Sequence, residues 1–240
     1  EIDLETGRGI GERRRIWGGT DAHFLEAPHI YRIGDWYYLM VAEGGTEYGH
    51  MITYARSKNP FGPFEGYAKN PVLTNRNQGG NEKQIQGIGH GDLICDAKGN
   101  YYIVCLGFRQ CGIWQPYHQL GREVFIAPVY WQEDGWFTAG DNGIVNEWME
   151  MDLSGEQNLH MYDVSFKTEG KDSLRWSYLR AYHKDNYEFP GEGLRLRGTE
   201  LTLNEADTPT FIGIRQSEFD TNLTVKVSGD AKEAGVTFYM

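Results

Sequence analysis

A four-part pattern that occurs twice constrains the fold of this chain more than any other feature. Each copy has an apolar strand, a tight turn, an aromatic-rich strand, a third strand after a loop and a short fourth strand. The first copy reads APHIYRIGDWYYLMVAEGG, HMITYARS and GPFEGY, and the second reads HGDLICDAKGNYYIVCLG, REVFIAPVYW and QEDGWFT. Gly34 and Gly99 occupy corresponding turns, 65 residues apart. A repeated four-stranded unit predicts the blades of a β-propeller.

The number of blades limits what the chain can build alone. A propeller needs at least four blades, whereas two complete ones can be counted here. We expect residues 1–20 to be the tail of a preceding blade, with residues 13–17 as its outer strand. Two blades alone leave open sheet edges. The pattern therefore predicts a chain that begins within a fold and lacks its N-terminal blades.

The pattern changes beyond Asn142. We assign residues 1–150 to the C-terminal blades of a propeller, residues 151–173 to a linker, and residues 174–240 to the start of a β-sandwich. The strands expected in the sandwich read LRWSYLRAYHKDNYEF, LRLRGTELTL, TPTFIGIRQSEF, TNLTVKVSGD and AGVTFYM. The sequence stops on the last of these, so we expect truncation at this end as well. The predicted fold class is all-β.

Composition excludes several classes of function. A formal net charge of −11 and a pI near 5.1 leave no basic surface for phosphates, so nucleic acid is not an expected partner. Membrane helices need about 18–20 apolar residues in a row, and none is present. Residues 1–20 are charged and rich in Gly, so no signal peptide lies within this chain. The compartment, whether cytoplasmic, periplasmic or extracellular, stays open.

Three ordered blocks carry a resemblance to a known family. The segment LEAPHIYRIGDWYYLMVAEGGT, residues 25–46, resembles the E-G-P-H region of glycoside hydrolase family 43, which contains β-xylosidases and α-L-arabinofuranosidases. The runs IQGIGHGDLICDAKGNYYIVCLG and LGREVFIAPVYWQEDGWF are similar to its G-H-A-D-L-V and L-G-R-E-T-F blocks. Residues after Leu174 resemble the accessory β-sandwich of the xylosidase branch. The resemblance implies a five-bladed propeller that cleaves hemicellulose by an inverting mechanism.

Glu26 is the predicted general acid. Inverting cleavage needs one carboxylic acid to protonate the leaving oxygen and a base to activate water on the opposite face of the sugar. Glu26 stands directly before Ala-Pro-His at the start of a strand, a position that in a propeller opens onto the central cavity. An apolar and aromatic wall at such a place can favour a protonated carboxyl. The family has Gly after the acid where this chain has Ala27, which we expect to be tolerated if its backbone angles are negative.

His90 and Arg122 are the predicted substrate-binding residues. His90, in GIGHGDL, matches the family histidine near the cavity floor that contacts a water or a calcium ion. Calcium prefers oxygen ligands, so a structural calcium would be contacted by His90 through water. Arg122, in LGREVF, matches the family arginine that reaches the sugar in the deepest subsite, where a guanidinium can bind hydroxyls. The alternative for Arg122 is an ion pair with Glu123 or a neighbouring carboxylate on a strand surface. No cofactor is required.

The catalytic base is not found in this chain. The family takes it from an Asp in the first blade and takes a tuning Asp from the third, and Asp21, Asp92 and Asp96 do not stand in either context. We therefore predict that the isolated chain is inactive and that it works with the missing blades on xylo-oligosaccharide or arabinoxylan. A non-catalytic carbohydrate-binding propeller is the alternative. A WD-type interaction propeller is disfavoured, because its repeats of about 40–45 residues end in Trp-Asp.

Overall fold

The computed structural model describes residues 2–76, 78, 84–112, 115–151 and 170–239. The chain divides into two compact units, Glu1–Gly155 and Glu156–Met240. Strands are the regular elements of both units, apart from one short 3₁₀ helix, η2, at Lys184–Asn186, in the part of the chain that the structure describes. The predicted all-β fold class is confirmed. Among the described residues, no helix is long and apolar enough to cross a membrane.

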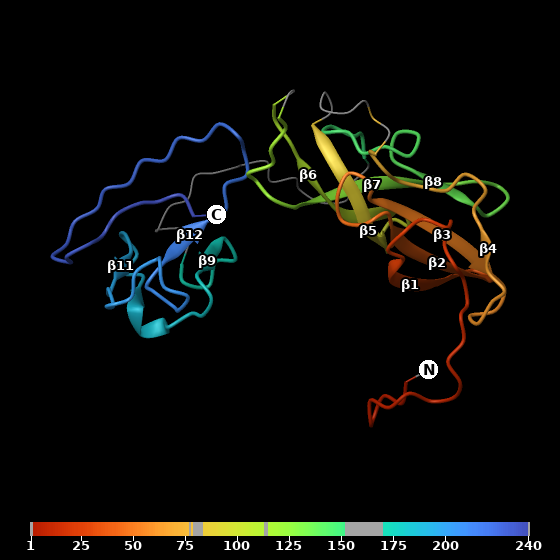
Figure 1. Cartoon of the computed structure of the whole chain (residues 1–240), viewed down its shortest axis with the longest axis horizontal. Coiled ribbons are helices and arrows are strands. Elements are labelled where there is room, and N and C mark those ends of the chain that lie inside the picture. Colours follow the sequence, from red (N-terminus) through yellow and green to blue (C-terminus); the bar gives the residue numbers. More distant parts are fainter. Residues whose placement is uncertain (1, 77, 79–83, 113–114, 152–169, 240) are drawn as a thin grey trace. The chain divides into compact units, whose positions relative to one another are not determined.

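The first unit contains two four-stranded antiparallel sheets, and each is one propeller blade (Figure 1). In both sheets the strands lie in chain order. The strands of the first blade are β1 (Glu26–Ile33), β2 (Trp36–Glu43), β3 (Met51–Ser57) and β4 (Glu65–Gly66). Those of the second are β5 (Ile85–Cys95), β6 (Tyr101–Arg109), β7 (Glu123–Trp131) and β8 (Phe137–Ala139). The two copies of the sequence pattern therefore correspond to two blades.

The turn between the first two strands of each blade is a glycine turn, as predicted. Gly34 takes φ 58° between β1 and β2, and Gly99 takes φ 89° between β5 and β6. Both angles lie in the left-handed region that glycine adopts without steric cost. In the second blade the Asp96 carboxylate also accepts hydrogen bonds from the backbone N–H groups of Lys98 and Asn100, at 2.9 and 2.8 Å.

The two blades share one hydrophobic core, in which β5 packs against β1, β2 and β3. Tyr54 on β3 is fully buried and stacks on Phe137 of β8 with ring centroids 4.0 Å apart. Its hydroxyl donates to the Phe137 carbonyl at 2.8 Å and accepts from the Phe137 N–H at 2.9 Å. Burial is the main cause that raises the pKa of this phenol. Tyr54 therefore joins the blades by packing and by a reciprocal hydrogen bond.

Arg56 forms a second link between the blades. Its guanidinium lies between the rings of Trp36 and Trp136, 4.2 and 3.9 Å from their centroids. It also donates to the backbone carbonyl of Asp134 at 2.7 Å. Because a guanidinium is attracted to aromatic faces and is weakly hydrated, it suits this buried position between two rings.

The predicted outer strand at residues 13–17 pairs in no ladder among the described residues. Its expected partners belong to a preceding blade, so the outer strand stays a prediction. The segment nevertheless runs along the outer edge of the first blade. A Cβ on Gly66 of β4 would lie 3.5 Å from the Trp17 ring, which is ordinary contact distance.

Among its described residues, the second unit contains four short strands in two pairs. They are β9 (Trp176–Tyr178), β10 (Tyr187–Glu188), β11 (Arg195–Leu196) and β12 (Ile212–Ile214). Strand β9 pairs with β12, and β10 pairs with β11. Tyr187 is buried among the Tyr178 and Tyr182 rings, and its hydroxyl donates to the Phe211 carbonyl at 3.0 Å.

Three of the five segments expected to form sandwich strands contribute to these pairs. The expected strands at 221–230 and 234–240 form no ladder among the described residues, and their apolar side chains Leu223, Val225 and Val227 are half exposed. The predicted linker, residues 151–173, lies mostly outside the described residues. Its bounds and those of the two predicted domains stay predictions.

Candidate functional site

Glu26 is the first residue of β1. It pairs with Ala42 on β2, and the ladder is irregular between Glu26 and His29, which marks a β-bulge. The Glu26 side chain is exposed in this chain. A bulge at the start of a strand turns a side chain away from the regular alternation, and bulges are common beside active sites. The predicted acid therefore stands where the innermost strand of the first blade departs from regular geometry.

The loop that leads into Glu26 is held by a buried carboxylate. Glu43, at the end of β2, is fully buried and accepts hydrogen bonds from the backbone N–H groups of Thr20 and Ala22 at 3.0–3.2 Å. The hydroxyls of Thr20 and Thr53 donate to the same carboxylate, at 3.1 and 2.5 Å. A buried carboxylate with this many donors is well satisfied. Glu43 thereby fixes the approach to the predicted acid.

Ala27 does not meet the condition under which we expect its methyl group to be tolerated. Its φ is +49°, in the left-handed region, because the bulge between Glu26 and His29 turns the backbone there. A non-glycine residue in this region costs of order 1 kcal/mol. The condition of negative angles is not met, and the residue beside the predicted acid carries backbone strain.

His90 also lies at an irregular point, in β5. This strand shifts register between Gln86 and Gly89 and again between Gly89 and Asp92, and His90 takes φ +50°. Its side chain is exposed. The glycines on either side permit close approach, as predicted: a Cβ on Gly91 would lie 2.5 Å from the Ile52 side chain, which packs from β3.

His50 is a residue that the sequence patterns do not select, and the structure places it at the centre of the site. It directly precedes β3 and its side chain is fully buried. The ring packs on Gly89, where a Cβ would come within 2.3 Å of its Cγ and Nδ1 atoms. Nδ1 lies 2.9 Å from the Gly87 carbonyl oxygen. Because a carbonyl only accepts, Nδ1 carries the proton, and in the neutral ring Nε2 is then an acceptor.

The three predicted site residues interact electrostatically with this one imidazole. Burial is the main cause that lowers the pKa of His50, and the Gly87 carbonyl opposes it. The Glu26 carboxylate also acts to raise this pKa, while His90 and Arg122 act to lower it. These three residues belong to β1, to β5 and to the position directly before β7. Their individual roles stay predictions.

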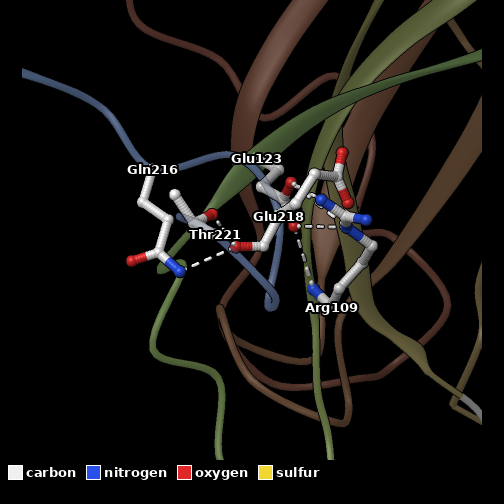
Figure 2. Close-up of polar contacts among 5 residues, drawn as sticks. All are labelled: Arg109, Glu123, Gln216, Glu218 and Thr221. Atoms are coloured by element: carbon white, nitrogen blue, oxygen red, sulfur yellow. Dashed lines mark hydrogen bonds and ion pairs between the residues drawn. The ribbon is translucent and has the colours of Figure 1, made fainter. Parts of the chain in front are cut away.

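Arg122 directly precedes β7 and is exposed. The predicted alternative for it is an ion pair with Glu123, and the Glu123 carboxylate is held by Arg109 of β6. Arg109 approaches Glu123 Oε1 at 3.0 Å through one terminal nitrogen, and its Nε lies 3.1 Å from Oε2 (Figure 2). The two side chains are only 12% and 19% exposed, so the pair is largely shielded from water. This pair fixes the start of β7, next to Arg122.

Asp92, to which the sequence patterns assign no role, links the blades. It accepts a hydrogen bond from the Tyr31 hydroxyl at 2.6 Å, and His29 Nδ1 lies 3.4 Å away. The same hydroxyl accepts from the Leu93 N–H at 3.0 Å. Burial and then the Asp92 hydrogen bond raise the pKa of Tyr31. These contacts hold β1 against β5, and Asp92 has a structural function in them.

The described side chains do not supply a calcium site by themselves. Within the described ranges, no group of three or more His, Cys, Asp and Glu side chains could hold a metal ion. His90 offers nitrogen, whereas calcium takes six to eight oxygen ligands. A calcium ion held chiefly by water near His90 stays a prediction, and no chemical step is derived through it.

The arrangement combines one carboxyl group, one guanidinium and two imidazoles of different exposure. A carboxyl group can donate a proton, and a guanidinium can bind sugar hydroxyls. The sequence does carry a signal for His50, because HMITYARS opens the third strand of the first blade. Its place in the site depends on Gly87, which is 37 residues further along the chain.

Comparison with known families gives two matches that divide the chain. The family model described as "Glycosyl hydrolases family 43" matches residues 1–137. The model described as "Beta xylosidase C-terminal Concanavalin A-like domain" matches residues 164–240. Together they account for most of the sequence.

Curated relatives resemble the chain over nearly its whole length. A non-reducing end α-L-arabinofuranosidase, BoGH43B, of Bacteroides ovatus is 38% identical over 95% of this chain and 43% of its own length. A xylosidase/arabinosidase of Butyrivibrio fibrisolvens is 36% identical over 90% of this chain and 42% of its own length. The chain thus spans less than half the length of the relatives that it matches.

Solved structures show the same fold. The Bacteroides ovatus "Xyloglucan PUL GH43B" structure has a TM-score of 0.76 at 38% identity and covers 91% of this chain and 43% of its own. The BlXynB protein of Bacillus licheniformis has a TM-score of 0.77 at 29% identity and covers 90% of this chain and 42% of its own. Both agree with a propeller blade assignment for the first unit.

Proposed function

This chain belongs to glycosyl hydrolases family 43, and we propose that it is part of an inverting glycosidase that removes terminal pentose units from plant hemicellulose. The observation that carries the proposal is that Glu26 and His90 each lie at a β-bulge, in strands β1 and β5, which pack against each other. Arg122 directly precedes β7, in the same blade as β5. Relatives named xylosidase, arabinosidase and arabinofuranosidase support the substrate class.

In the proposed reaction Glu26 is the general acid. Its carboxyl donates a proton to the glycosidic oxygen as the bond between that oxygen and the anomeric carbon breaks. A water activated by a base attacks the anomeric carbon from the opposite face, so the sugar leaves with inverted configuration. Arg122 binds hydroxyls of the terminal sugar, and His90 contacts the sugar or a bound water near it.

The base and the residue that tunes the acid are proposed to lie in further blades. The proposal is that residues 1–137 combine with these blades into a complete propeller, here called the complete enzyme. The second unit, matched to the xylosidase C-terminal domain, favours a β-xylosidase that acts at chain ends. The α-L-arabinofuranosidase assignment is kept beside it, because a relative at 38% identity carries that name.

Turnover of nitrophenyl pentosides tests whether the acid lies in this chain and the base in further blades. We expect the complete enzyme to hydrolyse nitrophenyl β-xyloside faster than nitrophenyl α-L-arabinofuranoside, with inverted product by NMR. We expect the isolated chain of 240 residues to hydrolyse neither. Clear turnover by the isolated chain, abolished by Glu26→Gln, would contradict the proposal that the base lies elsewhere. Faster arabinofuranoside hydrolysis would replace the xylosidase assignment.

A further inference from the structure

His50 has an orphaned atom that the proposed chemistry does not use. Its side chain is fully buried, and within the described residues Nε2 has no hydrogen-bond partner. A buried polar atom without a partner costs about 1–3 kcal/mol, so native proteins rarely leave one unsatisfied. The atom therefore points to a donor that the described residues do not supply.

The ring cannot turn to satisfy Nε2 without losing its anchor. Nδ1 is fixed on the Gly87 carbonyl at 2.9 Å, and Gly89 packs so closely on the ring that a Cβ would overlap it. A ring flip would direct a different atom at the Gly87 carbonyl. Since Nδ1 carries the proton, the atom left over is a lone-pair acceptor with fixed direction.

The donor for this acceptor is a small neutral molecule. The pKa of His50 is lowered chiefly by burial, and Arg122 and His90 lower it further, so the ring stays neutral beside the Glu26 carboxylate. Nε2 is closed to bulk solvent, which leaves no room for a sugar ring. An internal water needs two to four polar partners. Glu26 lies at the same end of its sheet as His50, because it pairs with Ala42, and Ala42 pairs with Ile52, two residues after His50.

We propose that His50 is a positioning residue: Nε2 accepts a hydrogen bond from an ordered water, and that water contacts the Glu26 carboxyl and holds it ready to donate its proton. This inference rests on the proposed function of Glu26 as the acid. The effect of His50 on the reaction is indirect, since it touches neither the sugar nor the bond that breaks.

Two substitutions separate the acceptor from the anchor. His50→Asn keeps an N–H donor near the Gly87 carbonyl and loses the acceptor at the Nε2 position, whereas His50→Gln keeps an acceptor near that position and loses the anchor. Each variant is made in the complete enzyme. Each is assayed on xylobiose, whose leaving group needs protonation, and on 2,4-dinitrophenyl xyloside, whose leaving group does not.

We expect His50→Asn to lower kcat about tenfold on xylobiose, with little change on the dinitrophenyl substrate and an unchanged KM. We expect His50→Gln to recover most of the xylobiose rate. Equal losses on both substrates would indicate a merely structural residue, and a raised KM alone would indicate direct sugar contact. Either result, or an unchanged rate in His50→Asn, overturns the proposal.

A control separates this inference from the proposed function. If Glu26→Gln leaves the xylobiose rate unchanged, the proposed acid is wrong. If Glu26→Gln abolishes that rate while His50→Asn does not lower it, only the role of His50 fails. Should the His50 variants not fold, a high-resolution crystal structure of the complete enzyme decides: density for a water within about 3.2 Å of both Nε2 and Glu26 is expected, and a dry Nε2 overturns the proposal.

Discussion

The two blades share one strand order, but their opening strands differ where the chemistry lies. Strand β1 has a single irregularity, with Ala27 in the left-handed region beside Glu26. Strand β5 has two, and Gly87 and His90 take positive φ there. The first blade supplies the Glu26 carboxyl and His50. The second blade supplies Gly87 and Gly89, which contact the His50 ring. The site therefore depends on irregular backbone in two neighbouring blades.

Substitution of Gly89, which packs on the His50 ring, has the largest effect on stability that we predict. Gly89→Ala would place a Cβ 2.3 Å from the His50 ring, so either the ring or β5 must move. We expect the free energy of unfolding of the complete enzyme to fall by about 2–3 kcal/mol, as in other overpacked cores. Urea unfolding measures this.

A matched glycine provides the control. Gly66 on β4 would meet the Trp17 ring only at 3.5 Å, so Gly66→Ala is expected to change the free energy of unfolding by less than about 0.5 kcal/mol. Equal losses in the two variants would show that Gly89 has no special relation to His50.

Loss of the hydrogen bonds between Tyr54 and Phe137 is expected to lower the stability by a smaller amount. Tyr54→Phe keeps the stack on Phe137 and removes the hydroxyl that bonds both its carbonyl and its N–H. We expect a loss of about 1–2 kcal/mol, because two buried backbone groups lose their partner. Thermal unfolding measures this loss, and Tyr130→Phe, whose ring is exposed, is the control variant. A change no larger than in Tyr130→Phe would mean that this hydrogen bond does not join the blades.

The smallest predicted effect has the opposite sign. Ala27→Gly removes a side chain from a residue with φ +49°, so we expect the free energy of unfolding to rise by about 0.5–1 kcal/mol. Ala42→Gly, in the regular strand opposite Glu26, should instead destabilise the protein. Destabilisation by both substitutions would show that Ala27 is not strained.

The strands and turns of each blade could be predicted from the sequence because they depend on neighbouring residues. Strand alternation and the glycine turns at Gly34 and Gly99 are set by neighbouring residues, and both are predicted correctly. The sign of φ at Ala27 does not follow from the local sequence, because a bulge depends on how β1 pairs with β2. The segment 13–17 forms no ladder among the described residues.

The site could be predicted only in part, for a related reason. Glu26, His90 and Arg122 lie in blocks that resemble a family, so short patterns are enough to select them. His50 is recognised only once Gly87 and Gly89 fold beside it, a contact between two blades that no local pattern encodes. The Arg109–Glu123 pair is also missed, since it joins neighbouring strands across a ladder.

The most direct test of the account is the leaving-group dependence of Glu26→Gln in the complete enzyme. If Glu26 is the general acid, kcat on xylobiose falls by about 10²–10⁴-fold, while kcat on 2,4-dinitrophenyl xyloside changes little, because that leaving group departs without a proton. Equal losses on both substrates, or no loss on xylobiose, would contradict the account.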